Sequence, residues 1–302
     1  MKRTLTRPGT RRGVALGAAA LTGMVTLLGF GAGTAGASPA GHGGGGRDYV
    51  ALGDSYASGP LIPDQVDPTC LRSSSNYPSL VAARENARLT DVSCSGATTA
   101  EMIAPQGAAP AQLAALKRGT DLVTLSIGGN DIGFSSVIAT CAGLTSADPT
   151  GAPCRAHFTA GGHDQLAERV AQTAPKVATV IRDIHRRAPH ARVVVAGYPD
   201  LFPDDGSACT SATVPFAAGD FAYLRDTEKA LNAMLATQAR KAGARYADTY
   251  TPTIGHDMCA PAGTRWIESL APATPAAPAH PNAQGEAAMA GAVHRVVTRH
   301  HR

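Results

Sequence analysis

Short apolar runs alternate with longer helical patterns along most of the chain, and this alternation constrains the fold more than any other feature. Five runs are predicted as strands, and the first of them, residues 49–52, has the length and composition of a buried strand. The five runs cover residues 49–52, 89–93, 121–127, 191–196 and 244–249. Strands that alternate with helices pack as a parallel sheet covered on both faces. The sequence therefore predicts an α/β fold, a single-domain three-layer α/β/α sandwich with a mainly parallel sheet.

The segments between these strands carry the apolar spacing of amphipathic helices, with repeats at three and four residues. We expect helices over residues 77–89, 111–118, 163–189, 221–242 and 283–299. The stretches 134–162, 198–215 and 251–279 are predicted as loops. Ligands of such sheets bind beyond the carboxyl ends of the strands. Catalytic groups are therefore expected just after Leu52, Ser93, Ile127 and Thr249.

The first 37 residues have the pattern of a secretory signal peptide. Five basic residues and no acidic one come first, an apolar run follows over residues 14–30, and Ala35-Gly36-Ala37 ends the segment. Cleavage is expected after Ala37. The paired Arg11-Arg12 leaves twin-arginine export open beside the ordinary route. A retained membrane anchor is the alternative, but the run is rich in Ala, Gly and Thr and makes a poor membrane span.

Removing this segment changes the charge of the protein. The whole chain has 27 Lys and Arg against 23 Asp and Glu, a formal net charge of +4. Without residues 1–37 the balance is 22 against 23, a net charge of −1. Residues 38–46 predict a flexible linker and residues 47–302 a folded domain. We expect a secreted, extracellular monomer with no stable membrane anchor and, because basic residues are not interleaved with aromatic ones, no nucleic-acid partner.

All six cysteines follow the predicted signal peptide. An even number of cysteines in a secreted chain implies disulfides, and six allow 15 pairings. Sequential pairing is the simplest of these, and it joins Cys70 to Cys94, Cys141 to Cys154 and Cys209 to Cys259. The sequence has no C-x-x-C pair and no other cluster of metal-ligating residues, so no metal and no cofactor are expected.

Four short blocks carry the candidate chemistry. Gly53-Asp54-Ser55 follows the first strand, and a serine at a strand-to-helix turn between glycines is exposed and reachable. The other blocks are Cys94-Ser95-Gly96, Gly129-Asn130-Asp131 and His280-Pro281-Asn282. The serine block is not the G-x-S-x-G elbow, which disfavours the usual α/β-hydrolase fold. Asp54 is expected to shape the turn, and Asp131 to cap the turn that follows it.

These four blocks, in this order, resemble the SGNH hydrolases, also called GDSL esterases and lipases. With the six cysteines, the chain looks like the secreted three-disulfide lipases and esterases of actinobacteria. The resemblance covers nearly the whole chain after the signal peptide and implies a flavodoxin-like catalytic domain over residues 47–302. It implies that Ser55 is the nucleophile and His280 the general base. The backbone N–H groups of Ser55 and Gly96 and the side-chain amide of Asn130 would form the oxyanion hole.

The sequence departs from the family pattern beside the histidine. Many relatives have an Asp three residues before it, which orients the imidazole, whereas this chain has Ala277. We therefore predict a Ser55–His280 dyad whose imidazole N–H is held by the backbone carbonyl of Ala277 or a close neighbour. A carboxylate bonded to His280 would contradict this prediction.

The expected activity is hydrolysis of carboxylic esters through an acyl-enzyme on Ser55, with acylglycerols or small acyl esters as substrates. A phospholipid acyl hydrolase and a carbohydrate deacetylase would carry the same blocks. An extracellular binding protein with an inactive site is the alternative from a different class. That alternative is disfavoured because the chain retains Ser55, Asn130 and His280.

Overall fold

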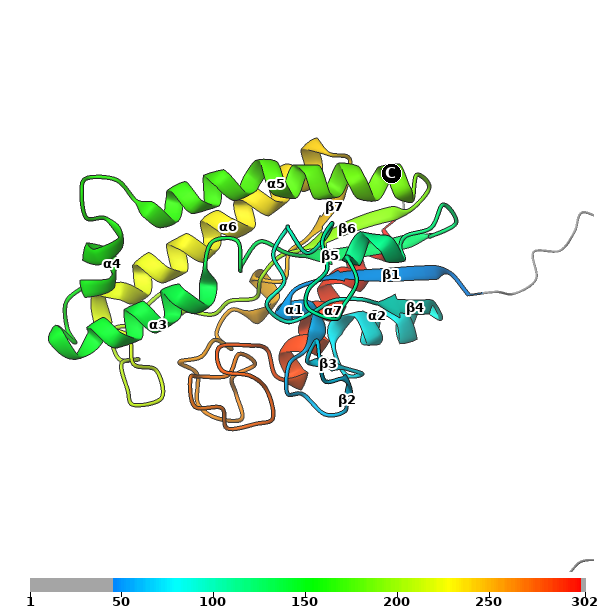
Figure 1. Cartoon of the computed structure of the whole chain (residues 1–302). Coiled ribbons are helices and arrows are strands. Elements are labelled where there is room, and N and C mark those ends of the chain that lie inside the picture. Colours follow the sequence, from blue (N-terminus) through cyan, green and yellow to red (C-terminus); the bar gives the residue numbers. More distant parts are fainter. Residues whose placement is uncertain (1–45, 300–302) are drawn as a thin grey trace, which may run out of the picture. The chain divides into compact units, whose positions relative to one another are not determined.

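Five parallel strands form the central sheet, in the order β4-β1-β5-β6-β7 (Figure 1). The computed structural model describes residues 46–299. The strands are β1 (Asp48–Gly53), β4 (Arg88–Asp91), β5 (Leu122–Ser126), β6 (Arg192–Ala196) and β7 (Arg245–Ala247). The strand order changes direction at β1, which pairs with β4 on one side and with β5 on the other. The predicted parallel α/β sheet is confirmed, and its order is flavodoxin-like.

Helices cover both faces of this sheet, as predicted. The helices of the described chain are α1 (Ser55–Ser58), α2 (Tyr77–Glu85), α3 (Phe134–Leu144), α4 (Pro153–Phe158), α5 (Gln165–Arg187), α6 (Phe221–Lys241) and α7 (Ala283–Thr298). Helices α5 and α6 pack together on one side, and α2 and α7 pack together on the other (Figure 1). Short 3-10 turns are η1 (Gln112–Ala115), η2 (Thr145–Ala147), η3 (Ala218–Asp220) and η4 (Thr251–Thr253). A small hairpin of β2 (Gln65–Asp67) and β3 (Arg72–Ser73) stands apart from the main sheet.

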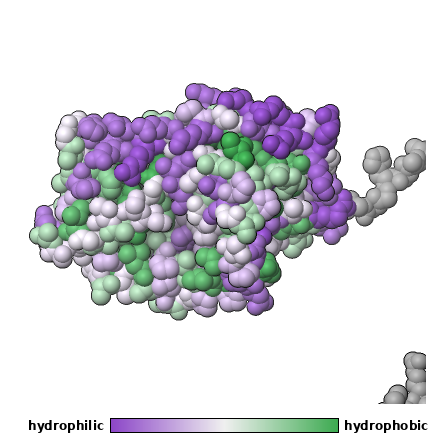
Figure 2. All heavy atoms as spheres, in the orientation of Figure 1, coloured by the Kyte–Doolittle hydropathy of each residue, from purple (hydrophilic) through white to green (hydrophobic). Residues whose placement is uncertain are grey.

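The sequence explains where these elements lie. Every residue of β1 after Asp48 is buried, because helices cover both faces of the sheet. Helix α5 begins at the cap Asp164, whose carboxylate accepts hydrogen bonds from two backbone N–H groups, and its apolar side faces the core. Figure 2 shows hydrophilic residues along the upper edge, where α5 presents its outer side. Asn282 caps α7 in the same way, which sets the start of that helix just after His280.

The prediction of a loop over residues 134–162 is wrong. Helices α3 and α4 occupy much of this stretch, and the disulfide between Cys141 and Cys154 joins them. Only Val137 and Cys141 are buried in α3. Two buried residues one turn apart are too few to produce a visible helical period in the sequence.

All three sequential disulfides are formed, with chain separations of 24, 13 and 50 residues. The predicted signal peptide, residues 1–37, lies outside the described residues, as does nearly all of the predicted linker, residues 38–46. Between residues 46 and 299, no helix is both long enough and apolar enough to cross a membrane.

Candidate active site

Ser55 stands at the turn between β1 and α1, where the sequence analysis placed it. The amide of Gln112 holds this turn, since it accepts from the N–H of Gly53 at 2.8 Å and donates to its carbonyl at 2.9 Å. The carboxylate of Asp54 accepts a hydrogen bond from the N–H of Tyr56 at 3.0 Å. Asp54 therefore shapes the turn, as predicted, and Ser55 becomes the first residue of a short helix.

His280 contacts the hydroxyl of Ser55 although 225 residues separate them in the chain. The distance from Nε2 of His280 to Oγ of Ser55 is 2.7 Å. The other ring nitrogen, Nδ1, lies 2.8 Å from the carbonyl oxygen of Pro278. A carbonyl can only accept, so Nδ1 carries the proton and Nε2 accepts from the Ser55 hydroxyl. This is the tautomer that a general base for Ser55 requires.

The carbonyl that faces the imidazole is that of Pro278, a close neighbour of Ala277, and not that of Ala277 itself. The Ala277 carbonyl instead accepts a hydrogen bond from the backbone N–H of His280 at 3.2 Å. Ala279 between them has a φ of +59°, so the chain turns sharply just before the histidine. This turn brings the carbonyl two residues before His280, rather than three, against its ring.

Aromatic side chains fix the plane of the imidazole. The ring of Tyr56 stacks on His280 with centroids 4.8 Å apart, and Phe134 meets it edge-on at 6.0 Å. The hydroxyl of Tyr56 also donates to the carbonyl of Ala279 at 2.8 Å, so one residue holds both the ring and the loop that carries it. Burial lowers the pKa of His280 below its usual value, and the hydrogen bond to Pro278 offsets part of this effect. The imidazole is therefore neutral and able to accept a proton at neutral pH.

The predicted oxyanion donors follow the ends of neighbouring strands. Asn130 donates from Nδ2 to the carbonyl of Ala97 at 2.9 Å, which joins its loop to the segment after Gly96. Gly96 has a φ of +83°, a conformation that favours glycine. Within residues 46–299, neither the N–H of Ser55 nor that of Gly96 donates to another protein group. Both are available to a substrate oxygen, and the amide of Asn130 has a second N–H to offer.

Tyr198 joins two parts of the site, and sequence reasoning missed it. Its hydroxyl donates to the Asp54 carboxylate at 2.5 Å and accepts from the N–H of Gly129 at 2.7 Å. A side chain on Gly129 would come within 3.0 Å of this hydroxyl, which explains the glycine there. Tyr198 comes just after the end of β6, a strand end that we did not include among the expected catalytic positions. The rule that groups gather at such ends would have found it.

Two other expectations concern the strand ends and Asp131, and neither is met in full. Ser55, Gly96 and Asn130 follow three of the expected strand ends. No site residue lies just after Thr249, and His280 instead stands at the far end of the long loop that follows β7. Asp131 does not cap the following turn. Its carboxylate instead accepts hydrogen bonds from the backbone N–H of Thr99 at 2.9 Å and from its hydroxyl at 2.5 Å.

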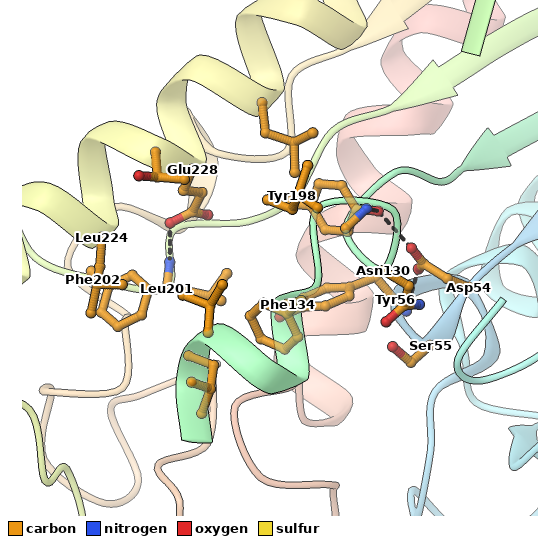
Figure 3. A pocket seen from close by; sticks show the side chains of 16 residues that line it. Asp54, Ser55, Tyr56, Asn130, Phe134, Tyr198, Leu201, Phe202, Leu224 and Glu228 are labelled. Carbon is orange, nitrogen blue, oxygen red and sulfur yellow. Dashed lines mark hydrogen bonds between the residues drawn. The ribbon is translucent and has the colours of Figure 1, made fainter. Parts of the chain in front are cut away.

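An apolar pocket extends from Ser55 toward α6. Figure 3 shows Ser55 and Asn130 at one end, Phe134 between, and Glu228 at the other end. The pocket has a cavity volume of about 50 Å³ and is partly open to solvent. Its walls come mainly from α3, α6 and the loop after β6. They are Ile132, Phe134, Val137, Ile138, Leu201, Phe202, Leu224 and Leu231.

One carboxyl group at the Ser55 end of this pocket titrates near neutrality. Burial raises the pKa of Asp54 to about 7, although hydrogen bonds from Tyr198 and from the Tyr56 N–H lower it. The Asp54 carboxylate accepts a hydrogen bond from Tyr198 and none from His280, whose ring is hydrogen-bonded to a carbonyl rather than to a carboxylate. No acidic group takes the third position of a triad among the described residues.

Comparison with known proteins agrees with this geometry. A model of the GDSL-like lipase/acylhydrolase family matches residues 51–288. The chain belongs to this family. The family model spans the serine turn, the segments of Gly96 and Asn130, and His280. The chain is thus a carboxylic ester hydrolase of the lipase and esterase type.

Several similar proteins come from Streptomyces. Lipase 2 of Streptomyces coelicolor is 44% identical over 250 residues, which are 80% of this chain and 83% of that protein. A lipase of Streptomyces rimosus is 35% identical over 74% of this chain and 76% of its own length. The crystal structure of an extracellular lipase from S. rimosus has a TM-score of 0.66 at 31% identity, and that of phospholipase A1 from Streptomyces albidoflavus NA297 has 0.67 at 29%. Each alignment covers 83% of this chain and 98% of the solved chain.

Proposed function

We propose that Ser55 and His280 form a catalytic dyad that hydrolyses acyl esters in two steps. The 2.7 Å contact between Nε2 of His280 and Oγ of Ser55 carries this proposal, together with the Pro278 carbonyl that fixes the tautomer. In the first step Oγ attacks the ester carbonyl while Nε2 takes its proton. The imidazolium then gives that proton to the departing alcohol, which leaves an acyl group on Ser55.

Water completes the reaction. His280 removes a proton from a water molecule, which attacks the acyl carbonyl, and the proton returns to Oγ as the acid leaves. In both steps the carbonyl oxygen becomes negative. The N–H groups of Ser55 and Gly96 and the amide of Asn130 would stabilise this charge, each by roughly 2.7–4 kcal/mol.

The substrates that we propose are esters of apolar acyl chains. The pocket that begins at Ser55 has apolar walls, and burial of each CH₂ group contributes roughly 0.8 kcal/mol. An acetyl group, the substrate of a carbohydrate deacetylase, would leave this pocket unfilled. The likeness to a phospholipase A1 supports phospholipids as a second substrate class.

A labelling experiment tests the dyad. A serine-reactive phosphonate is expected to modify the wild-type protein stoichiometrically at Ser55, and p-nitrophenyl acyl esters to be hydrolysed. Ser55→Ala and His280→Ala should each lose almost all activity. Full activity in either variant would contradict the mechanism, and a protein that remains unlabelled would favour a binding function instead.

We also propose that the protein acts outside the cell, after removal of residues 1–37. The three disulfides and the likeness to an extracellular lipase support this. Expression of the full chain in an actinobacterial host should place active enzyme in the medium. Its amino terminus, read by sequencing, is expected to begin after Ala37, and retention in the membrane fraction would contradict the proposal.

A further inference from the structure

Glu228 places a carboxyl group at the end of the pocket far from Ser55 (Figure 3). It lies on α6, and only 7% of its surface is exposed. One carboxyl oxygen, Oε2, accepts a hydrogen bond from the backbone N–H of Leu201 at 3.2 Å. The other, Oε1, is buried and has no hydrogen-bond partner within the described part of the chain.

The other polar groups along the pocket wall are satisfied. Asp54 and Tyr198 bond to each other, and the hydroxyl of Thr227 donates to the carbonyl of Tyr223. Among the pocket-lining residues of the described chain, Glu228 alone has a buried polar side-chain atom without a partner. Buried polar atoms in proteins are nearly always paired, so an unpaired one beside a substrate pocket indicates a group that the substrate supplies.

The protonation state of Glu228 indicates the kind of group. Burial, and then the nearby carboxylate of Asp200, raise the pKa of Glu228 well above the usual range for glutamate. A neutral carboxyl group can both donate and accept a hydrogen bond. The surrounding walls include Leu224 and Leu231, which would not solvate a charged ligand group. A neutral hydroxyl fits these conditions.

We propose that Glu228 is a specificity-determining residue that selects acyl chains carrying a hydroxyl group. The apolar walls near Ser55 would hold the hydrocarbon part of the chain, and its hydroxyl would bond to the free carboxyl oxygen. An unsubstituted chain of the same length would reach the same place and leave that oxygen unpaired. This inference rests on the proposed function, because it assumes that the acyl group enters the pocket from Ser55.

Matched ester pairs test the proposal. Each pair consists of the p-nitrophenyl ester of a straight-chain acid and the ester of the same acid with one hydroxyl group. Across the series of pairs, the hydroxyl is placed at successive positions from the middle of the acyl chain to its end. The ratio of their kcat/KM values is the readout. For the wild-type enzyme we expect a preference of about fivefold at one hydroxyl position, the size of one neutral hydrogen bond. Equal values at every position would overturn the proposal.

Variants assign this preference to the carboxyl group. Glu228→Leu should abolish it, whereas Glu228→Gln, which keeps a donor and an acceptor, should retain most of it. Leu224→Met, in the same wall, is the matched control and should alter both esters alike. Persistence of the preference in Glu228→Leu would overturn the assignment. If that variant does not fold by thermal melting, persistence of the preference in Glu228→Met, which is closer to glutamate in shape and has no comparable hydrogen-bonding group, would do so. Failure of the proposed function differs from these results, because neither ester of any pair would then be cleaved in a Ser55-dependent way.

Discussion

The variant Tyr198→Phe removes one hydroxyl group. It tests whether this hydroxyl holds both the serine turn and the Asn130 loop in position. The hydroxyl bonds to the Asp54 carboxylate and to the Gly129 N–H. Its loss leaves both buried groups without this partner, and each such loss costs about 1–3 kcal/mol. The hydrogen bond from Tyr198 lowers the pKa of Asp54, so the variant should raise that pKa above about 7. Protonation of Asp54 then relieves part of the cost, and we expect the free energy of unfolding to fall by about 2–4 kcal/mol.

The catalytic effect follows from the position of Gly129 next to Asn130. Complete loss of one oxyanion donor lowers kcat roughly 10²- to 10³-fold. Tyr198→Phe displaces this donor without removing it, so kcat should fall about ten- to a hundredfold. The KM for a p-nitrophenyl ester should change little, because the hydroxyl is already occupied by its hydrogen bonds with Asp54 and Gly129.

A second buried tyrosine provides the matched control. The hydroxyl of Tyr49 in β1 bonds to Thr124 at 2.7 Å, and its side chain is fully buried outside the active site. Tyr49→Phe should lower stability in urea unfolding without lowering kcat. If Tyr198→Phe keeps kcat within twofold of Tyr49→Phe while both lose stability, Tyr198 supports only the fold and the reasoning fails.

Three further results are expected. Asn130→Ala should lower kcat roughly 10²- to 10³-fold in ester hydrolysis with a small change in KM, and a mainly KM effect would show that the amide binds substrate rather than oxyanion. Because burial lowers the pKa of His280, kcat/KM should stay on its plateau until the pH falls below about 6.5 and then decrease as the imidazole is protonated. If kcat/KM instead changes near pH 7, and this change disappears in Asp54→Asn, the titration belongs to Asp54, whose pKa is about 7. Replacing Cys209 and Cys259 by serine should lower the free energy of unfolding by about 4 kcal/mol, since the bridge spans 50 residues, and an unchanged urea midpoint would contradict that bridge.

The central strands β1, β5 and β6 were predictable because they are short apolar runs that helices on both faces of the sheet bury. Long helices such as α5 were predictable for a related reason, since many turns of one helix repeat the same apolar spacing. Helix α3 has only two buried residues and depends on tertiary contacts and a disulfide, which a sequence window does not contain. The same limit explains why the β2–β3 hairpin was missed, because its strands have three and two residues.

The site was predictable to the extent that each residue follows a strand end. Ser55, Gly96 and Asn130 each follow such an end. The resemblance of their blocks to a family then predicted their roles and that of His280. The Pro278 carbonyl was not predictable in detail, because the choice between it and Ala277 depends on the positive φ of Ala279. No local rule assigns that conformation to an alanine. Glu228 was missed because one glutamate on a helix looks like any other until its burial is known.

The Pro278 carbonyl gives the dyad a different electrostatic balance from that of a triad. A carboxylate beside His280 would favour the imidazolium and raise the pKa of the ring, whereas a neutral carbonyl orients the same N–H with a smaller effect. The ring is therefore neutral over a wider range on the acidic side, and it gains less stabilisation when it takes the Ser55 proton. Stacking on Tyr56 limits the entropy lost in that step, because the ring is already held in place. With a carbonyl in place of a carboxylate, the imidazolium that forms during the reaction is stabilised less. In return His280 remains neutral, and able to act as a base, at lower pH.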